Sequence, residues 1–182
     1  VALMLAVQRL KFYPQSKILF LAPTKPLVEQ HLQTFKSHLE IDSEKIVLFT
    51  GEVTPAKRAD LWKNAQFVFS TPQGMENDII NNTINLQDVS LLVFDEAHRA
   101  VGDYSYVFLA KQYDKRAQYP RILALTASPG SELQTIEDVC KNLHIEELEI
   151  RTYKDPDMQQ YIQPIDITTT KIELPEDFRT II

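Results

Sequence analysis

Two carboxylates stand side by side directly after an apolar run. Residues 91–94 are apolar, and Asp95-Glu96-Ala97-His98 follows them. Adjacent charges of like sign at the end of a buried strand are costly unless a cation or hydrogen bonds compensate them. A magnesium ion, which prefers oxygen ligands, is the simplest compensation. The pattern therefore predicts that Asp95 holds magnesium through its waters and that Glu96 polarises a water that attacks a γ-phosphate.

A simpler interpretation of the pair is structural. Asp95 could begin a solvated loop and cap the turn that follows it. For an isolated Asp-Glu pair this interpretation would be preferred, because charged residues are mostly exposed. The apolar run before the pair and the Ala97-His98 after it favour the chemical interpretation here.

Polar residues follow three other apolar runs. These segments are Ala22-Pro23-Thr24-Lys25, Ser70-Thr71-Pro72-Gln73 and Thr126-Ala127-Ser128. In open α/β sheets, ligands bind beyond the carboxyl ends of the strands. We therefore expect the three segments and the carboxylate pair to meet at one edge of a sheet.

The apolar runs themselves predict buried strands. They are rich in Val, Ile, Leu and Phe and are apolar almost throughout, which is typical of a parallel sheet covered on both faces. Their bounds are 17–22, 45–50, 67–70, 90–95 and 121–126. Helical spacing occurs at 1–10, 26–39, 55–64, 73–80, 104–118 and 132–143. This alternation predicts an open, doubly wound α/β sheet.

Size and composition fit one domain with a short appendage. The chain has 182 residues, of which 44% are hydrophobic. Its net charge of −6 gives no overall positive field, so a nucleic-acid site would have to be local. Cys140 is the single cysteine, which excludes an internal disulfide and a multi-cysteine zinc site and fits a reducing intracellular setting. No apolar run is long enough to span a bilayer.

The four polar segments resemble the motifs of a known family. Asp95-Glu96-Ala97-His98 resembles the DEAH form of motif II of superfamily 2 helicases, and the segments ending at Lys25, Gln73 and Ser128 resemble motifs Ia, Ib and III. Segments 22–28, 94–102 and 125–130 are similar to the Hef/FANCM helicases of fork and crossover repair, the archaeal Hef branch above all. The resemblance extends over nearly the whole chain. It departs at Asp103, where the family has Asn.

The resemblance implies a RecA-like lobe and a role for each motif. Asp95 would coordinate Mg²⁺, and Glu96 would be the catalytic base for ATP hydrolysis. His98 would link the nucleotide site to the segment Thr126, Ala127 and Ser128. Helix capping ahead of Glu132 is a second interpretation of Thr126 and Ser128, and it is compatible with the first.

The resemblance also implies a track for one nucleic-acid strand. The residues that would line it are Pro23, Thr24, Lys25, Gly51, Thr71, Pro72 and Gln73. Backbone N–H groups, hydroxyls and a cation suit phosphate contacts, and helices that begin after Lys25 and Thr71 would point their N-terminal dipoles at the phosphates. The alternative is that these residues only start helices, with proline in the first turn. For Trp62, Tyr104 and Tyr106, packing is a better interpretation than base stacking.

The expected ligands are ATP, Mg²⁺ and DNA that is forked, branched or single-stranded. An RNA-directed relative and a catalytically inactive nucleic-acid-binding scaffold are the alternatives. No membrane is expected as a partner. The expected location is the cytoplasm of a prokaryote or archaeon, or the nucleus if the source is eukaryotic.

A nucleotide motor also needs a glycine-rich loop that ends in Gly-Lys-Thr or Gly-Lys-Ser. The glycines of this chain are followed by Glu52, Met75, Asp103 and Ser131. Family order puts that loop before Val1, so we expect it, like the second lobe, to lie outside the sequence and the fragment alone to be inactive. We expect 1–164 to form the lobe and 165–182 to form a strand and the start of a linker into a helical insert.

Overall fold

The computed structural model describes residues 1–128, 132–152 and 155–156, which fall into two compact units, Val1–Glu147 and Leu148–Ile182. The first unit holds all the candidate site residues. In the second unit, Arg151 pairs with Glu149 at 2.6 Å and Asp155 accepts hydrogen bonds from Thr152. No helix in the described part of the chain is both long enough and apolar enough to cross a membrane.

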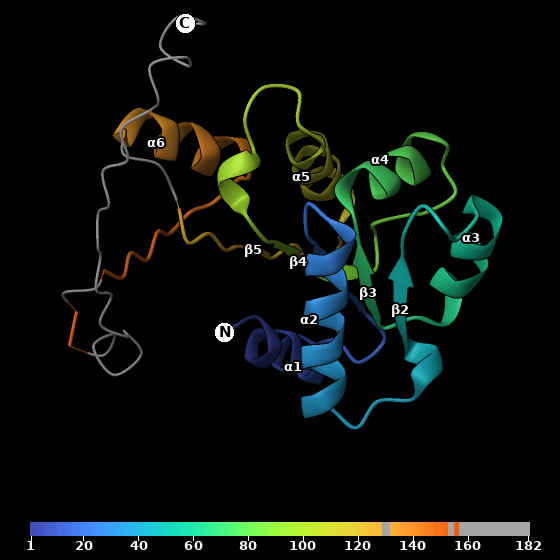
Figure 1. The fold of residues 1–182 in the computed structure, drawn as a ribbon. Helices are drawn as coiled ribbons and strands as arrows, with labels where there is room; N and C mark the ends of the chain where they lie inside the picture. Colours follow the sequence, from blue (N-terminus) through green and yellow to red (C-terminus); the bar gives the residue numbers. More distant parts are fainter. Residues whose placement is uncertain (129–131, 153–154, 157–182) are drawn as a thin grey trace, which may run out of the picture. The chain divides into compact units, whose positions relative to one another are not determined.

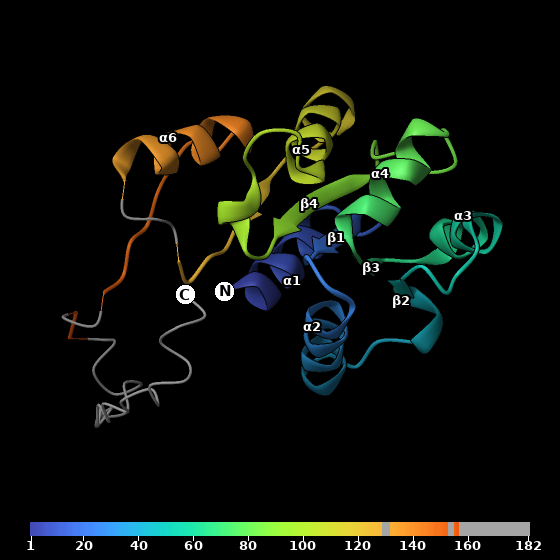
Figure 2. The same ribbon diagram turned by 45° about the horizontal axis from the view of Figure 1, so that its top comes forward.

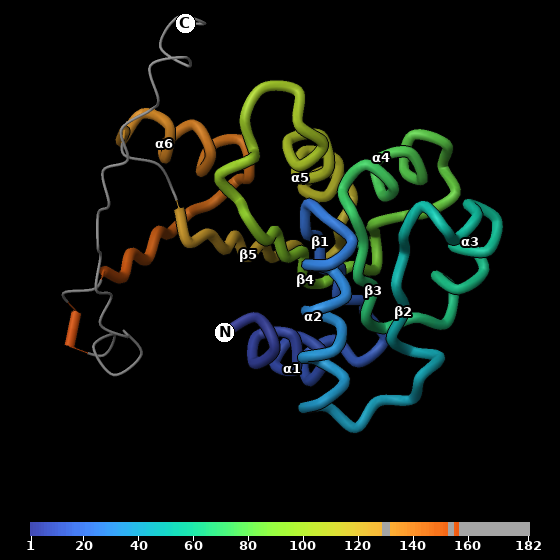
Figure 3. Tube along the Cα trace, viewed as in Figure 1, coloured from blue at the N-terminus to red at the C-terminus, as the bar shows by residue number. Residues whose placement is uncertain are grey.

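The first unit is built around one parallel sheet. Its strands are β1 (Lys17–Leu21), β2 (Ile46–Phe49), β3 (Phe67–Ser70), β4 (Val89–Phe94) and β5 (Ile122–Ala124). They lie in the order β2-β3-β1-β4-β5, and every neighbouring pair is parallel (Figures 1 and 3). The predicted open, doubly wound α/β fold is confirmed.

Helices cover both faces of this sheet. They are α1 (Ala2–Phe12), α2 (Lys25–His38), α3 (Pro55–Asn64), α4 (Pro72–Ile80), α5 (Ser105–Arg116) and α6 (Leu133–Asn142). Two 3₁₀ turns, η1 (Ser43–Lys45) and η2 (Ala97–Arg99), complete the described elements. Figure 2 shows α4 and α5 on one side of the sheet and α1 and α2 on the other.

Alternating side chains of each strand enter two separate cores. In β1, Ile18 and Phe20 pack with α1 and α2, whereas Leu19 and Leu21 pack with the core under α3, α4, α5 and α6. All six residues of β4 are buried. Burial on both faces explains why the strand sequences are apolar throughout.

Most predicted elements form within one or two residues of their expected bounds. The largest difference among the strands is β5, which ends at Ala124 whereas 121–126 was expected. The segment Leu148 to Arg151 is a further short strand candidate from its sequence, and that prediction is wrong, because these residues form no helix or strand and Leu148 and Ile150 are exposed. A short segment such as Leu-Glu-Ile-Arg forms no stable strand without a paired neighbour. The strand and the start of a linker expected at 165–182, and the division at 164/165, lie outside the described residues.

The chain leaves β1 and β4, which are neighbours in the sheet, toward opposite faces. Strand β1 leads into α2, whereas β4 leads through η2 into α5 on the other face. Open α/β sheets bind ligands at such a divergence, beyond the carboxyl ends of the two strands. The segments that follow β1 and β4 carry Lys25 and Asp95.

Candidate functional site at the carboxyl edge of the sheet

The turn after β4 is held by backbone hydrogen bonds to both neighbouring strands. The amide of Asp95 donates to the carbonyl of Leu21 at 2.9 Å. On the other side, the amide of Leu125 donates to the Phe94 carbonyl at 2.8 Å, and the amide of Ala97 donates to the Leu125 carbonyl at 2.9 Å. The turn is therefore fixed relative to the segments that follow β1 and β5.

Asp95 and Glu96 are both partly exposed at this edge. The backbone of Glu96 is left-handed, with φ 52° and ψ 47°, and it ends the extended chain of β4 before η2 begins. A left-handed residue other than glycine costs about 1–2 kcal/mol. The surrounding structure must therefore hold this conformation in place.

Asp95 has a partner that the sequence analysis missed. Its Oδ2 lies 2.8 Å from Nε2 of His31, whose ring also packs 4.3 Å from the ring of Phe20. Both side chains are partly buried, with 17% of Asp95 and 27% of His31 exposed. His31 falls on the face of α2 that carries the buried Val28, Leu32 and Phe35. A polar residue at a core-facing helix position was the signal that could have identified it.

Glu96, His98 and Thr126 form a connected group. Nδ1 of His98 lies 3.2 Å from Oε2 of Glu96 and 2.9 Å from Oγ1 of Thr126. The amide of Ser128 donates to the same Thr126 oxygen at 3.1 Å. Ala127 is exposed between them. The structure thus brings the predicted catalytic turn and the predicted coupling segment into direct contact.

Lys25 connects two of the predicted track segments. Its Nζ lies 2.5 Å from Oε1 of Glu52, the neighbour of Gly51, and 3.8 Å from Oε1 of Glu29. The hydrogen bond with Glu52 is the main reason why the pKa of Lys25 is raised. Glu52 was not predicted as a site residue. The segment that follows β1 is therefore held to the one that follows β2.

The strand order separates the predicted residues into two groups along one edge. Gly51 follows β2, Thr71 follows β3 and Pro23 follows β1, so the track residues occupy one half of the edge. Asp95 follows β4 and Thr126 follows β5 in the other half. Pro72 is buried in the first turn of α4, whereas Thr24 and Gln73 are exposed.

A buried ion pair between α3 and α4 stabilises the half of the edge that carries the track residues. Arg58 of α3 donates from Nε and Nη2 to the two carboxylate oxygens of Asp78 in α4, at 2.5 and 2.7 Å. Its Nη1 donates to the carbonyl of Val53, two residues after Gly51. Both charged side chains are almost fully buried. This pair ties the Gly51 segment to the helix that begins after Thr71.

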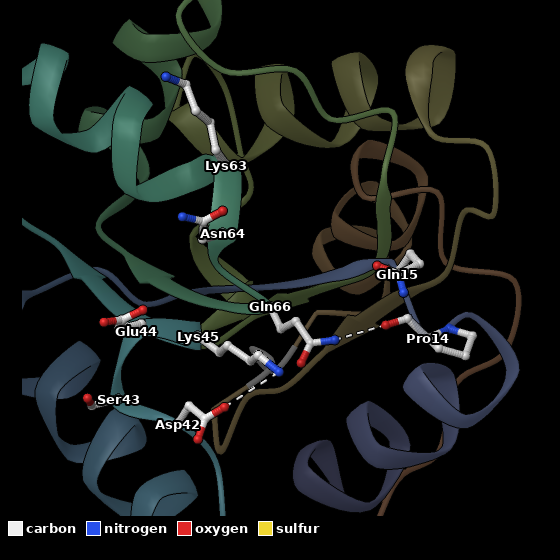
Figure 4. A pocket seen from close by; sticks show the side chains of 9 residues that line it. All are labelled: Pro14, Gln15, Asp42, Ser43, Glu44, Lys45, Lys63, Asn64 and Gln66. Carbon is white, nitrogen blue, oxygen red and sulfur yellow. Dashed lines mark hydrogen bonds and ion pairs between the residues drawn. The ribbon is translucent and has the colours of Figure 1, made fainter.

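A large cavity elsewhere on the unit contains none of these residues. It has a volume of about 840 Å³ and lies before β1, β2 and β3, at the amino edge of the sheet (Figure 4). Pro14, Lys45 and Gln66 are among its lining residues. We place the candidate site at the carboxyl edge because long-range contacts between ionisable and hydroxyl side chains converge there.

The donor atoms of the carboxylate pair suit Mg²⁺ with few protein ligands. Within the described residues, no group of three or more His, Cys, Asp or Glu side chains could hold a metal ion. Mg²⁺ sites commonly use one or two carboxylates together with water and substrate phosphates. Asp95 and Glu96, both partly exposed at the carboxyl edge, fit that kind of site.

Comparisons with known proteins agree with this geometry. The family model of the DEAD/DEAH box helicases matches residues 1–136. The crystal structure of the Hef helicase domain of Pyrococcus furiosus superposes with a TM-score of 0.86 at 46% identity, over 99% of this chain and 38% of that one. A Methanocaldococcus jannaschii protein named as an ATP-dependent RNA helicase is 44% identical over 90% of the chain, and the ATP-dependent DNA helicase mph1 of Neurospora crassa is 39% identical over 97%. The chain spans 21% and 15% of the length of these two relatives.

Proposed function

Because the chain belongs to the DEAD/DEAH box helicase family, we propose that it forms one lobe of an ATP-dependent DNA helicase or translocase that acts on branched or forked DNA. One observation carries the proposal. The Asp95 turn, the Thr126 segment and the Lys25 segment share the carboxyl edge of one sheet, where hydrogen bonds and ion pairs link them to their neighbours. A structural role for the carboxylate pair would not require this convergence.

In this proposal the nucleotide binds over the β4 and β5 half of the edge. Asp95 would hold Mg²⁺, and the ion would neutralise charge on the phosphates of ATP. Glu96 would accept a proton from the attacking water. The hydrogen bond with His31 uses Oδ2 of Asp95, which leaves the other carboxylate oxygen to face a hydrated cation. No part of this arrangement depends on the large amino-edge cavity.

His98 is the proposed connection between the nucleotide site and the segment that carries Thr126 and Ser128. The His98 side chain contacts both the proposed base Glu96 and Thr126, so a shift of His98 would alter the contacts of both residues. Nucleic-acid binding could in this way alter the orientation of the base. The contact supports the coupling role, and Ser128 would take part through its hydrogen bond to Thr126.

The track residues are suited to phosphates. Thr54 caps α3 by accepting from the amide of Lys57, whereas the side chains of Thr24 and Thr71 make no such bond at the starts of α2 and α4. Pro26 and Pro72 have no N–H, so the remaining first-turn amides, those of Lys25 and Leu27 in α2 and of Gln73 and Gly74 in α4, stay available for phosphate oxygens. At Gly51 nothing lies within 4 Å of the position that a β-carbon would take, so packing does not require glycine there. In this proposal the glycine lets a ligand approach the backbone closely.

RNA is the second candidate substrate, because one relative is named an RNA helicase and another a DNA helicase. Phosphate contacts carry little information about the kind of nucleic acid. We favour DNA because of the similarity to the Hef domain and mph1. Stimulation of ATP hydrolysis by forked DNA and by duplex RNA, compared at equal nucleotide concentration, separates the two.

The test of the proposed function is Glu96→Gln in the full-length gene product. This change keeps the size and hydrogen-bonding capacity of the side chain but removes the base, so we expect forked-DNA-stimulated ATP turnover to fall by about 100-fold or more. Affinity for ATP and DNA should stay within about twofold. Glu44→Gln, which changes an exposed carboxylate in the amino-edge cavity, is the matched control. Turnover in Glu96→Gln equal to that of the control would refute the assignment, and absence of ATPase activity in the natural protein would favour the scaffold.

A further inference from the structure

Tyr106 connects the core to the backbone of the catalytic turn. It lies in the first turn of α5, and its side chain is fully buried. Its hydroxyl donates a hydrogen bond to the carbonyl of Asp95 at 2.7 Å and lies 3.3 Å from the carbonyl of Leu21. The ring packs edge-on against Phe94, 4.7 Å between centroids, and is therefore fixed against the last residue of β4.

The carbonyl that Tyr106 contacts belongs to the peptide group joining Asp95 to Glu96. Rotation of that peptide group changes φ of Glu96, which has the left-handed value of 52°. Within the described residues the structure shows no other donor to this carbonyl oxygen. The hydroxyl of Tyr106 is thus the one described donor to the carbonyl of the peptide whose orientation sets the left-handed φ of Glu96.

Burial raises the pKa of the Tyr106 phenol well above its ordinary value, and the nearby Asp95 and Glu96 carboxylates act in the same direction. The protonated phenol is the form that donates to the Asp95 carbonyl, as the 2.7 Å contact requires.

The same helix supplies an internal reference. Tyr113 lies two turns further along α5 and is also fully buried. Its hydroxyl bonds only the backbone of Arg121, accepting from the amide at 3.0 Å and lying 3.3 Å from the carbonyl, just before β5 begins. The two tyrosines are alike in helix, burial and type of partner. They differ in position, because the Tyr106 hydroxyl lies at the carboxyl edge of the sheet and the Tyr113 hydroxyl lies at the amino edge.

From this comparison we infer that Tyr106 is a positioning residue for Glu96, and that its hydroxyl holds the Asp95–Glu96 peptide so that the base points at the attacking water. The inference rests on the proposed function, since it assumes that Glu96 is the base. Tyr106 touches neither substrate nor cofactor in this role. It acts through the backbone of the turn.

The experiment compares Tyr106→Phe and Tyr113→Phe in the full-length gene product. Each variant loses one buried hydroxyl, so both should lower the melting temperature by a similar amount. Only Tyr106→Phe should lower kcat for ATP hydrolysis, by about tenfold, which is the rate equivalent of one net hydrogen bond. The KM for ATP should stay unchanged, because the orientation of the base, and not nucleotide binding, is altered.

Two outcomes overturn the inference: equal kcat values for the two tyrosine variants, or a loss in Tyr106→Phe that appears in KM alone. Glu96→Gln measured in the same assay separates the failure of the inference from that of the proposed function. If Glu96→Gln is inactive while Tyr106→Phe turns over normally, the base assignment stands and the positioning role falls. If Glu96→Gln is fully active, the proposed function fails first.

Discussion

The two edges of the sheet are both polar, yet they are organised differently. At the carboxyl edge, ionisable and hydroxyl side chains contact partners far away in sequence, as in His31 with Asp95 and His98 with Thr126. At the amino edge, the ion pairs are local: Lys45 lies 3.6 Å from Asp42, three residues away. Figure 4 shows this pair, with Lys63 pointing away from it.

Two long-range hydrogen bonds beside the amino-edge cavity end on backbone carbonyls, and further along the same edge the buried hydroxyls of Ser16 and Ser90 lie 2.6 Å apart. Gln66 donates to the carbonyl of Pro14 at 2.9 Å, and Lys17 donates to that of Ala65 at 2.8 Å. Such bonds satisfy the ends of strands and stabilise the fold. Among the described residues, these two bonds bring no unlike side-chain groups face to face across the cavity.

Parallel topology explains the difference. Each strand of this sheet is followed by a helix on its carboxyl side, so helix N-termini with their free amides gather at that edge. The amino edge receives the chain as it returns from the helices. Long-range convergence of side chains, more than the size of a cavity, therefore marks the site in this fold.

The strongest test of the functional difference between the two edges is to remove one carboxylate from each edge. Asp95→Asn should lower ATP turnover of the full-length gene product by roughly 1,000-fold, because it removes the proposed metal ligand and its several kcal/mol of charge stabilisation. Asp42→Asn changes an exposed carboxylate at the amino edge and should leave turnover within about twofold. Steady-state ATPase assays across a magnesium titration measure both. Similar losses in the two variants would remove the functional difference between the edges.

A second comparison concerns stability. Arg58→Ala leaves the carboxylate of Asp78 buried and unpaired, so the free energy of unfolding should fall by about 3 kcal/mol. Lys63→Ala removes an exposed pair with Asp60 near the amino edge and should change it hardly at all. Urea titration of the 182-residue chain can be followed by Trp62, its single tryptophan, which is buried in α3. Equal destabilisation by the two changes would contradict the supporting role given to Arg58.

The fold and the motifs could be predicted from the sequence because both depend on local patterns. Apolar runs such as 90–95 have only one stable place, inside a sheet covered on both faces. The resemblance to Hef/FANCM helicases, drawn from the segments around Lys25, Asp95 and Thr126, is confirmed by the family match and by the Hef domain. Periodicity and motif order are properties that a single chain displays directly.

The partners of the site residues could not be predicted in the same way. His31 and Asp95 are 64 positions apart, and Glu52 meets Lys25 only because β2 and β1 both leave the sheet at the same edge. Tyr106 was interpreted correctly as a packing residue, but its hydroxyl bond to the Asp95 carbonyl depends on how α5 crosses the end of β4. Such contacts follow from topology, which local sequence does not specify.

The smallest expected effect concerns the pair formed by Lys25 and Glu52. In the proposed track a phosphate must compete with the Glu52 carboxylate, which lies 2.5 Å from the Lys25 ammonium. Glu52→Gln removes the competing charge and should tighten binding of single-stranded DNA by a few fold, roughly what one exposed ion pair contributes. Fluorescence anisotropy of a labelled oligonucleotide measures this change.

Lys25→Ala sharpens the same test by removing the cation. The slope of log K against log salt concentration should become shallower by about 0.7, the value for one phosphate contact on a single strand. Lys45→Ala removes a lysine of similar exposure from the amino edge and should leave the slope unchanged. The salt dependence of binding reports the number of ionic contacts and is insensitive to small losses of stability. A shallower slope in Lys45→Ala, or an unchanged slope in Lys25→Ala, would contradict the placement of the track at the carboxyl edge.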